Sequence, residues 1–264
     1  MALPMPGGRL SSSDPEAGVS AVDEVTVLVT GFGPFRDEFP VNPSFLIANS
    51  LPPILNAIAG SPVSVRILIH PHPVRVAYKD VRELVPRLLG SKDANFDIVL
   101  HIGMASGRDY YSIESQGHRD GYDKNADVDE KTPPADDGAT FWPDCDPVLK
   151  PSFDFDGLWR KWQSNLLGMA AFDQLMVDVD ARPSEDPGHY LCDFIYYSSL
   201  AWYFRKGPDG RDGERPVMFL HVPADSSPVD IERGRGVAVG LIRALADNWS
   251  VRKRGSGSAG LLKG

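Results

Sequence analysis

The chain has 264 residues, 42% of them hydrophobic, and a formal net charge of −9 at pH 7. This length and apolar content predict one domain built around one sizeable core. The acidic balance argues against nucleic acid and anionic membrane surfaces as partners, because both bind basic surfaces.

The two ends of the chain differ from its middle. Residues 1–23 and 251–264 are rich in small and polar residues, and we expect them to be disordered tails around a domain at 24–250. The first 24 residues lack an apolar run of signal-peptide length, and no segment approaches the roughly 20 apolar residues of a membrane span. The only cysteines are Cys145 and Cys192, too few for a secreted disulfide framework. We therefore expect a cytoplasmic protein.

Between the tails, apolar runs typical of buried strands alternate with segments of helical periodicity. In chain order the pattern predicts strand 25–30, helix 44–51, strand 64–70, helix 76–89, strand 96–102, helix 153–169, strand 174–179, helix 190–204, strand 216–222 and helix 229–248. Pro86 is expected to kink or end the second helix. This order predicts a single-domain α/β fold, a three-layer α/β/α sandwich with a mostly parallel, twisted sheet.

Two polar segments interrupt the alternation, at residues 118–152 and 181–189. Loops as long as the first are usually functional or disordered. The sequence assigns neither segment a role.

Three reactive residues fall where an open α/β sheet binds ligands, beyond the carboxyl ends of its strands. His221 ends the last predicted strand, Glu114 follows the turn after strand 96–102, and Cys192 opens a helix. An imidazolium and a helix N-terminus both stabilise a thiolate, the imidazole can shuttle its proton, and a carboxylate can orient the imidazole. The trio therefore predicts a cysteine hydrolase. The ordinary alternative for a cysteine on an aromatic-rich helix is burial in the core.

Four segments occur in the order found in a known family: Thr30–Phe35 with Asn42–Ser44, Gly103–Arg108 with Ile113–Glu114, Gly188–Phe194 with Tyr196–Leu200, and Phe219–Pro223. Together they resemble type I pyroglutamyl peptidase (pyrrolidone-carboxylate peptidase), and the segment 117–122 resembles its eukaryotic branch. The resemblance implies an α/β/α sandwich. It also implies a cysteine-type omega peptidase that hydrolyses the N-terminal pyroglutamyl residue from peptides through an acyl-enzyme, without a cofactor.

The resemblance assigns catalysis to Glu114, Cys192 and His221. It assigns substrate binding to a second set: Phe32, Phe35, Asn42 and Met104. Two aromatic faces can sandwich the flat lactam, Asn42 is expected to hold the loop, and Met104 stands where the bacterial pattern has Gln.

The sequence leaves open which cation stabilises the oxyanion of the reaction. The family's oxyanion-stabilising Arg lies after the catalytic Glu, where Arg119 and Lys124 are the candidates. The backbone N–H of Cys192 is a further expected donor. Arg108 is expected to brace the glycine-rich turn by pairing with a carboxylate.

No metal site is expected. A calcium-loop spacing begins at Asp123, but Val128 and Pro134 stand where that loop needs Gly and Glu. His70 and His72 have no further ligands beside them.

One alternative function is a catalytically impaired homologue that binds pyroglutamyl or related lactam ligands. Another is a hydrolase of a different small lactam or amide. In every case we expect a monomer without nucleic-acid or membrane partners.

Overall fold

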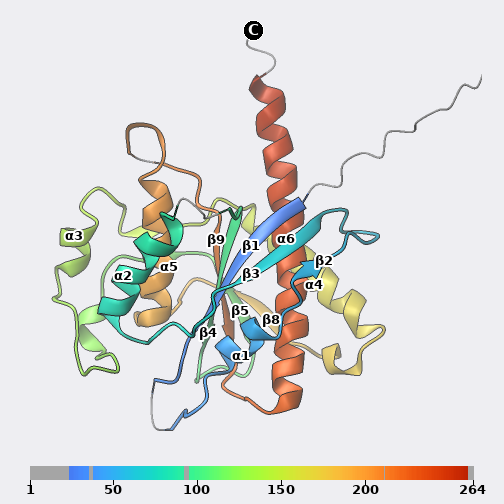
Figure 1. Ribbon diagram of the computed structural model, residues 1–264, viewed down its shortest axis with the longest axis horizontal. Coiled ribbons are helices and arrows are strands. Elements are labelled where there is room, and N and C mark those ends of the chain that lie inside the picture. The colour runs from blue at the N-terminus through green and yellow to red at the C-terminus, as the bar shows by residue number, and fades with distance from the viewer. Residues whose placement is uncertain (1–23, 36–37, 92–94, 211, 261–264) are drawn as a thin grey trace, which may run out of the picture.

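The structure is a computed structural model that describes residues 24–35, 38–91, 95–210 and 212–260 (Figure 1). The predicted tail at 1–23 lies outside the described residues. None of the described helices has the length and hydrophobicity of a membrane-spanning segment.

A seven-stranded sheet forms the centre of the molecule, in the order β2-β3-β1-β4-β9-β5-β8. β1, β3, β4 and β9 are parallel, whereas β5 runs antiparallel to β9, β8 is parallel to β5, and β2 is antiparallel to β3. The strands are β1 Glu24–Gly31, β2 Ile54–Leu55, β3 Ser64–Ile69, β4 Ile98–Met104, β5 Tyr111–Glu114, β8 Ala181–Ser184 and β9 Val217–Val222. A separate two-stranded sheet pairs β6 Gly117–His118 with β7 Val148–Leu149.

Helices cover both faces of the sheet (Figure 1). On one face lie α1 Pro43–Asn49, α4 Phe155–Ala170 and α6 Pro228–Gly260; on the other lie α2 Tyr78–Leu89 and α5 Leu191–Phe204. The remaining helical segments are α3 Asp137–Phe141 and the 3-10 turns Tyr122–Lys124, Gln174–Met176 and Pro208–Gly210. Because strand side chains alternate, Val27 and Val29 enter the core under α6 while Leu28 enters the core under α5. The predicted single-domain, three-layer α/β/α sandwich is confirmed.

The predicted strand 174–179 is wrong. Residues 174–176 form a 3-10 turn whose Met176 is buried against the α6 side, and the strand comes later, as β8 at Ala181–Ser184. β8 is an edge strand paired only with β5, so it tolerates the exposed residues Arg182 and Pro183. A search for runs of apolar residues does not find such a strand. β5 itself was not predicted as a strand, because four residues of mixed polarity give no periodicity.

One predicted helix ends where expected and another is longer. Pro86 does not end α2, which continues to Leu89 as the predicted helix 76–89 does. α6 continues to Gly260, so residues 251–260 are helical rather than a disordered tail. No proline interrupts this stretch, and ion pairs of Arg252 with Glu214 (2.8 Å) and of Lys253 with Asp97 (3.0 Å) tie its start to the domain.

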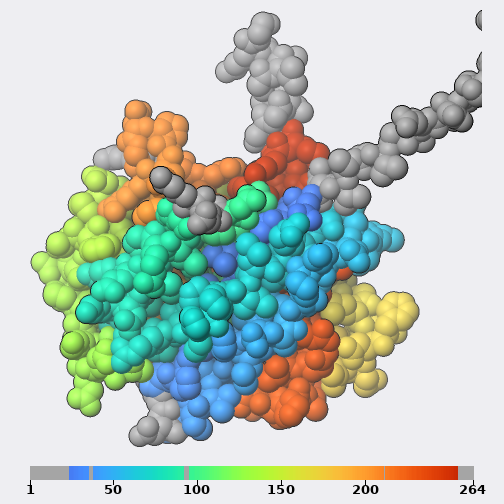
Figure 2. Space-filling model, in the orientation of Figure 1, coloured from blue at the N-terminus to red at the C-terminus, as the bar shows by residue number. Residues whose placement is uncertain are grey.

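The long polar segment 118–152 packs against the domain and forms the yellow-green surface on one side of the molecule (Figure 2). Its Tyr122, Trp142, Cys145 and Leu149 are buried in the core beneath α5. This segment therefore contributes to the layer that contains the predicted nucleophile.

His101 is an uncharged histidine in the middle of β4, without exposed surface. Its ring lies between the hydroxyls of Thr30 (2.7 Å) and Ser199 (3.0 Å). Burial, together with the positive charge of His70, lowers its pKa to about 3.

This depressed pKa predicts acid sensitivity. Between about pH 7.5 and pH 5 the unfolded chain binds a proton at His101 that the folded chain does not, so the free energy of unfolding falls as the pH falls, by about 2 kcal/mol from this group. Denaturant titrations at both pH values should show that the His101→Gln variant loses about 2 kcal/mol less than the wild type. An identical loss in both proteins would contradict this origin.

Candidate active site

Two strands distant in sequence bring the predicted carboxylate to the predicted base. β5 runs antiparallel to β9 and pairs Ser112 with His221, so Glu114, two residues further along, lies on the same face as His221. Glu114 Oε1 lies 2.7 Å from His221 Nδ1, and the two side chains are 0% and 4% exposed. A carboxylate on Nδ1 fixes the tautomer and orientation of the ring and leaves Nε2 for proton transfer.

Arg108 bonds to the same carboxylate oxygen as His221. Its guanidinium lies 2.7 Å from Glu114 Oε1 and 2.6 Å from Ser112 Oγ, and it donates a third hydrogen bond of 2.6 Å to the carbonyl of Asp186. The expected carboxylate partner of Arg108 is therefore the predicted catalytic Glu. The contact to Asp186 also ties this group to the segment that leads into α5.

The hydrogen bonds decide the charge of Glu114. Burial by itself would raise its pKa, but the hydrogen bond and the positive charge of His221, with the hydrogen bonds from Ser184 and Arg108, outweigh burial and lower the pKa to about 2. The carboxylate is therefore ionised at neutral pH, as an orienting group must be.

The sulfur of Cys192 lies against Gly103 of β4. Cys192 is the second residue of α5 and is partly exposed. A Cβ built on Gly103 would lie 2.8 Å from Cys192 Sγ, so the sulfur rests on the backbone of β4. Gly103 pairs with His221 across β4 and β9, so the His221 side chain and the open Cβ position of Gly103 lie on the same face of the sheet, the α5 face. A glycine within a buried strand signals such close approach, and this is the feature of Gly103 that the sequence interpretation missed.

The thiol is not pre-ionised by these surroundings. Burial raises the pKa of Cys192, the negative charges of Glu114 and Asp193 raise it further, and Arg108 opposes them. The thiol is therefore protonated at neutral pH, and its activation needs a base such as His221.

The first turn of α5 offers N–H donors near the sulfur. Its N-cap residue, Tyr190, makes no side-chain hydrogen bond to that turn. The N–H groups of Leu191 and Cys192 precede the first intrahelical bond, which Phe194 donates to Tyr190, so they can stabilise a developing oxyanion.

The two cations predicted for that role are placed differently. Arg119 donates to Asp120 Oδ2 (3.1 Å) and to the carbonyl of Cys145 (3.0 Å), so its guanidinium is engaged within the segment 118–152. Lys124 is exposed on a 3-10 turn. Arg108 is the cation in direct contact with the predicted catalytic carboxylate.

The predicted pocket aromatics border the same core as Cys192. Phe32 is 2% exposed and belongs to the cluster beneath α5, against which the less buried Phe35, Tyr190 and Cys192 pack. The ring of Phe35 lies 6.1 Å from that of Tyr190. Phe35 and Tyr190 thus form the more accessible aromatic surface, and Phe32 lies deeper.

Asn42 and Met104 also lie near the ends of strands. Asn42 donates to the carbonyl of Gly33 (2.9 Å), and its oxygen accepts from the backbone N–H of Ser44 at the start of α1. It therefore holds the turn after β1, as expected. Met104 is buried at the end of β4, directly after Gly103.

Gly103 gives a direct test of this geometry. An alanine there would place its Cβ 2.6 Å from the ring of Phe219 and 2.8 Å from Cys192 Sγ. Since displacing a reacting group by about 1 Å costs about 100-fold in rate, we expect the added methyl group to displace Cys192 Sγ and to lower the kcat/KM of the Gly103→Ala enzyme about 100-fold. The matched control is Gly107→Ala, because a Cβ on Gly107 meets no atom within 4 Å. Equal activities in the two folded variants would contradict the close packing.

Comparison with known proteins gives consistent matches. The family model described as pyroglutamyl peptidase matches residues 25–137. The pyroglutamyl-peptidase 1 of Mus musculus is 28% identical over 207 residues, which cover 78% of this chain and 83% of that protein. The human pyroglutamyl-peptidase 1 is 28% identical over 222 residues, covering 84% and 90%. The structure of the pyrrolidone carboxyl peptidase of Thermococcus litoralis superimposes with a TM-score of 0.62 at 17% identity, covering 87% and 96%, and supports the fold.

Proposed function

We propose, from the premise that this chain belongs to the pyroglutamyl peptidase family, that it is a cysteine-type omega peptidase that removes the N-terminal pyroglutamyl residue from peptides. The observation that carries the proposal is the ionised Glu114 bonded to His221 on the face where Cys192 Sγ rests against Gly103. These side chains supply an orienter, a base and a nucleophile.

The proposed reaction has two halves. In the first, His221 takes the thiol proton while the sulfur of Cys192 bonds to the carbonyl carbon that follows the pyroglutamyl ring. The N–H groups of the first turn of α5 stabilise the oxyanion, and collapse breaks the C–N bond as His221 gives its proton to the leaving amine. In the second half, His221 takes a proton from water as the water oxygen attacks the thioester carbon. The C–S bond then breaks, His221 returns the proton to Cys192 Sγ, and free pyroglutamate is released.

The proposed specificity rests on a small, flat, uncharged lactam. Phe35 and Tyr190 would present their rings to it, with Phe32 beneath them and Asn42 holding the turn that carries both phenylalanines. A site that pairs the ring N–H and C=O strongly rejects analogues that lack one of them.

Turnover of a matched substrate series tests the proposal. The wild-type chain should release aminomethylcoumarin from its pyroglutamyl amide, and prolyl and glutaminyl amides should be cleaved at least about 100-fold more slowly. Prolyl lacks the ring carbonyl, so its ring nitrogen is a charged amine, and glutaminyl lacks the ring and carries a charged α-amine. No release from the pyroglutamyl amide would refute the proposal, and calorimetric binding of pyroglutamate without turnover would instead indicate the impaired homologue.

We further propose that the enzyme acts as a cytoplasmic monomer. Both cysteines are free thiols, which suits a reducing compartment. Light scattering coupled to gel filtration should give a mass near 28.9 kDa. A mass twice as large would contradict the monomer.

A further inference from the structure

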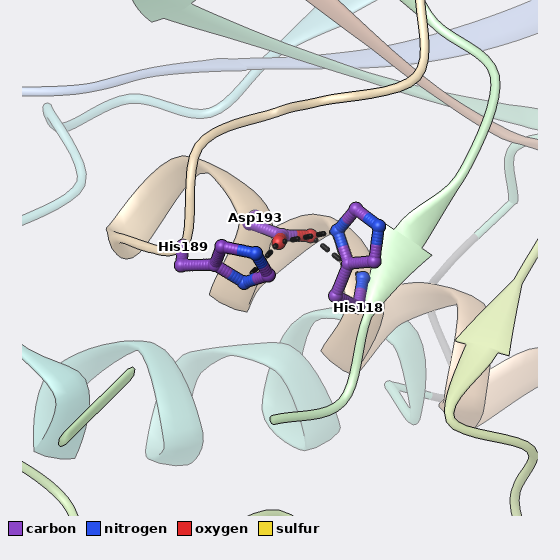
Figure 3. Close-up of side chains that lie close together, drawn as sticks. All are labelled: His118, His189 and Asp193. Carbon is purple, nitrogen blue, oxygen red and sulfur yellow. Dashed lines mark hydrogen bonds and ion pairs between the residues drawn. The ribbon is translucent and has the colours of Figure 1, made fainter. Parts of the chain in front are cut away.

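A second cluster of reactive side chains lies beside the first turn of α5. Its members are His118 on β6, His189 just before α5, and Asp193 on α5. Figure 3 shows the two imidazole rings on either side of the Asp193 carboxylate. His118 Nδ1 lies 2.9 Å and His189 Nδ1 lies 3.7 Å from the same oxygen, Asp193 Oδ2.

These separations suit a small tetrahedral cation. Zinc binds imidazole nitrogen and carboxylate oxygen at about 2.0–2.2 Å, so two of its ligand atoms lie about 3.3 Å apart. The two distances at Asp193 Oδ2 fall on either side of that value, and one ligand atom from each of the three residues lies within 4.8 Å of the others. Small rotations of the rings would therefore equalise the three separations.

We propose that His118, His189 and Asp193 bind a zinc-class divalent cation through two imidazole nitrogens and one carboxylate oxygen. Two His and one carboxylate with an open fourth position is a ligand set that zinc uses. Magnesium and calcium prefer oxygen ligands, so the same residues discriminate against them. The sequence spacing gave no sign of this site, because 75 residues separate His118 from Asp193.

The burial of the ligands favours a built site over a surface coincidence. Asp193 has no exposed side-chain surface, its second oxygen accepts from the backbone N–H of His118 (2.8 Å), and His118 is 19% exposed. His189 is 47% exposed, so one side of the cluster is open to an entering ion. An ordinary hydrogen-bonded pair of His118 and Asp193 would explain why one imidazole faces the carboxylate. It would not explain why the ring of His189 faces it as well.

Neighbouring groups can adapt to the bound ion. The cation replaces the proton between His118 and Asp193, and the proton of His118 then resides on Nε2. Gln116 Nε2 lies 3.4 Å from that nitrogen and donates to the carbonyl of Glu185 (3.1 Å). Turning the amide so that its oxygen faces the ring would let it accept this proton's hydrogen bond in exchange for the bond to Glu185. His189 exchanges its contact with the carbonyl of Asp120 (3.2 Å) for the ion. Occupancy would thereby join β6 and the segment before α5 to the turn that carries Cys192.

Direct metal binding tests the site independently of catalysis. The full chain carrying Cys192→Ser, which lacks the proposed nucleophilic thiol, should bind one Zn²⁺ by calorimetry and give the visible absorption of tetrahedral Co²⁺. At a Zn²⁺ concentration 100 times the Kd, the midpoint of thermal unfolding should rise by roughly 5 °C or more. Mg²⁺ at the same concentration should do neither.

A matched pair of histidine variants identifies the ligands. In the same background, His189→Ala should weaken Zn²⁺ binding at least about tenfold and abolish the Co²⁺ spectrum. His72→Ala removes another exposed imidazole, from the His70–His72 ring pair outside the cluster, and should leave both unchanged. His189→Ala should fold, because its side chain is half-exposed and holds one backbone carbonyl. Undiminished Zn²⁺ binding in His189→Ala, or no binding to the parent chain, would overturn the site.

Discussion

Replacing Cys192 by serine is expected to reduce kcat/KM for the pyroglutamyl coumarin substrate by at least about 10⁴-fold. Burial and nearby carboxylates already raise the pKa of this thiol, so proton removal by His221 is demanding even for sulfur. A hydroxyl at the same place is far less acidic, and its shorter bond to carbon withdraws the nucleophile from the substrate. Cys192→Ala, which has no nucleophile, should be at least as inactive.

The other cysteine provides the control. Cys145 is buried beneath α5 in the segment 118–152, and no hydrogen bond or ion pair links it to Glu114 or His221 among the described residues. Cys145→Ala should therefore keep kcat/KM within about threefold of the wild type at a temperature where both are folded. The assignment of the nucleophile would be withdrawn if Cys192→Ser retained full activity, or if Cys145→Ala alone abolished it.

Glu114→Gln is expected to lower kcat by about 10³–10⁴-fold, as neutralising the carboxylate of a catalytic triad does elsewhere. The amide can present N–H instead of oxygen to His221 Nδ1, which favours the wrong tautomer. It also leaves the guanidinium of Arg108, which is 19% exposed, without its ionic partner. KM should change much less than kcat, because Glu114 acts through His221 rather than on the substrate.

The pH dependence of folding stability tests the ionised state of Glu114 separately from its effect on kcat. Since the folded pKa of Glu114 is about 2, below the 4.5 of an ordinary Glu, its contribution is complete above pH 4.5 and is lost as the pH falls toward 2. The wild type should therefore lose more stability than Glu114→Gln across that range. Glu185→Gln makes the same charge change at an exposed neighbour of the site and should leave kcat unchanged. A Glu114→Gln protein with wild-type kcat would exclude the orienting role.

The parts of the fold that follow from local pattern were predictable. β1, β4 and β9 are mostly apolar and almost wholly buried, because parallel strands in the middle of a sheet are covered on both faces. The same logic failed at the edge of the sheet. β5 and β8 gain their pairing from β9 and from each other, so their residues need neither apolar runs nor clean alternation.

The candidate site divides along the same line. Cys192 at a helix start, His221 at a strand end and Glu114 after the turn that follows a strand are local features, and the family resemblance assigned catalysis to all three. The sequence could not show that Arg108 clamps Glu114, since that contact depends on the turn between β4 and β5 folding back onto the sheet. Nor could it show that Arg119 would instead bond to Asp120 and the carbonyl of Cys145.

By itself the sequence determined the layers of this protein and the residue types available for its chemistry, because the spacing of apolar residues within each segment indicates its secondary structure and its buried face. Only the tertiary structure decided which of those residues meet. The antiparallel register of β5 on β9 joins Glu114 to His221 across 107 residues, and the glycine at 103 makes room for the sulfur of Cys192. Packing of β6 against α5 brings His118 to Asp193 in the same way, across 75 residues. Such contacts depend on long-range pairing and close approach between elements, which no periodicity within one element encodes.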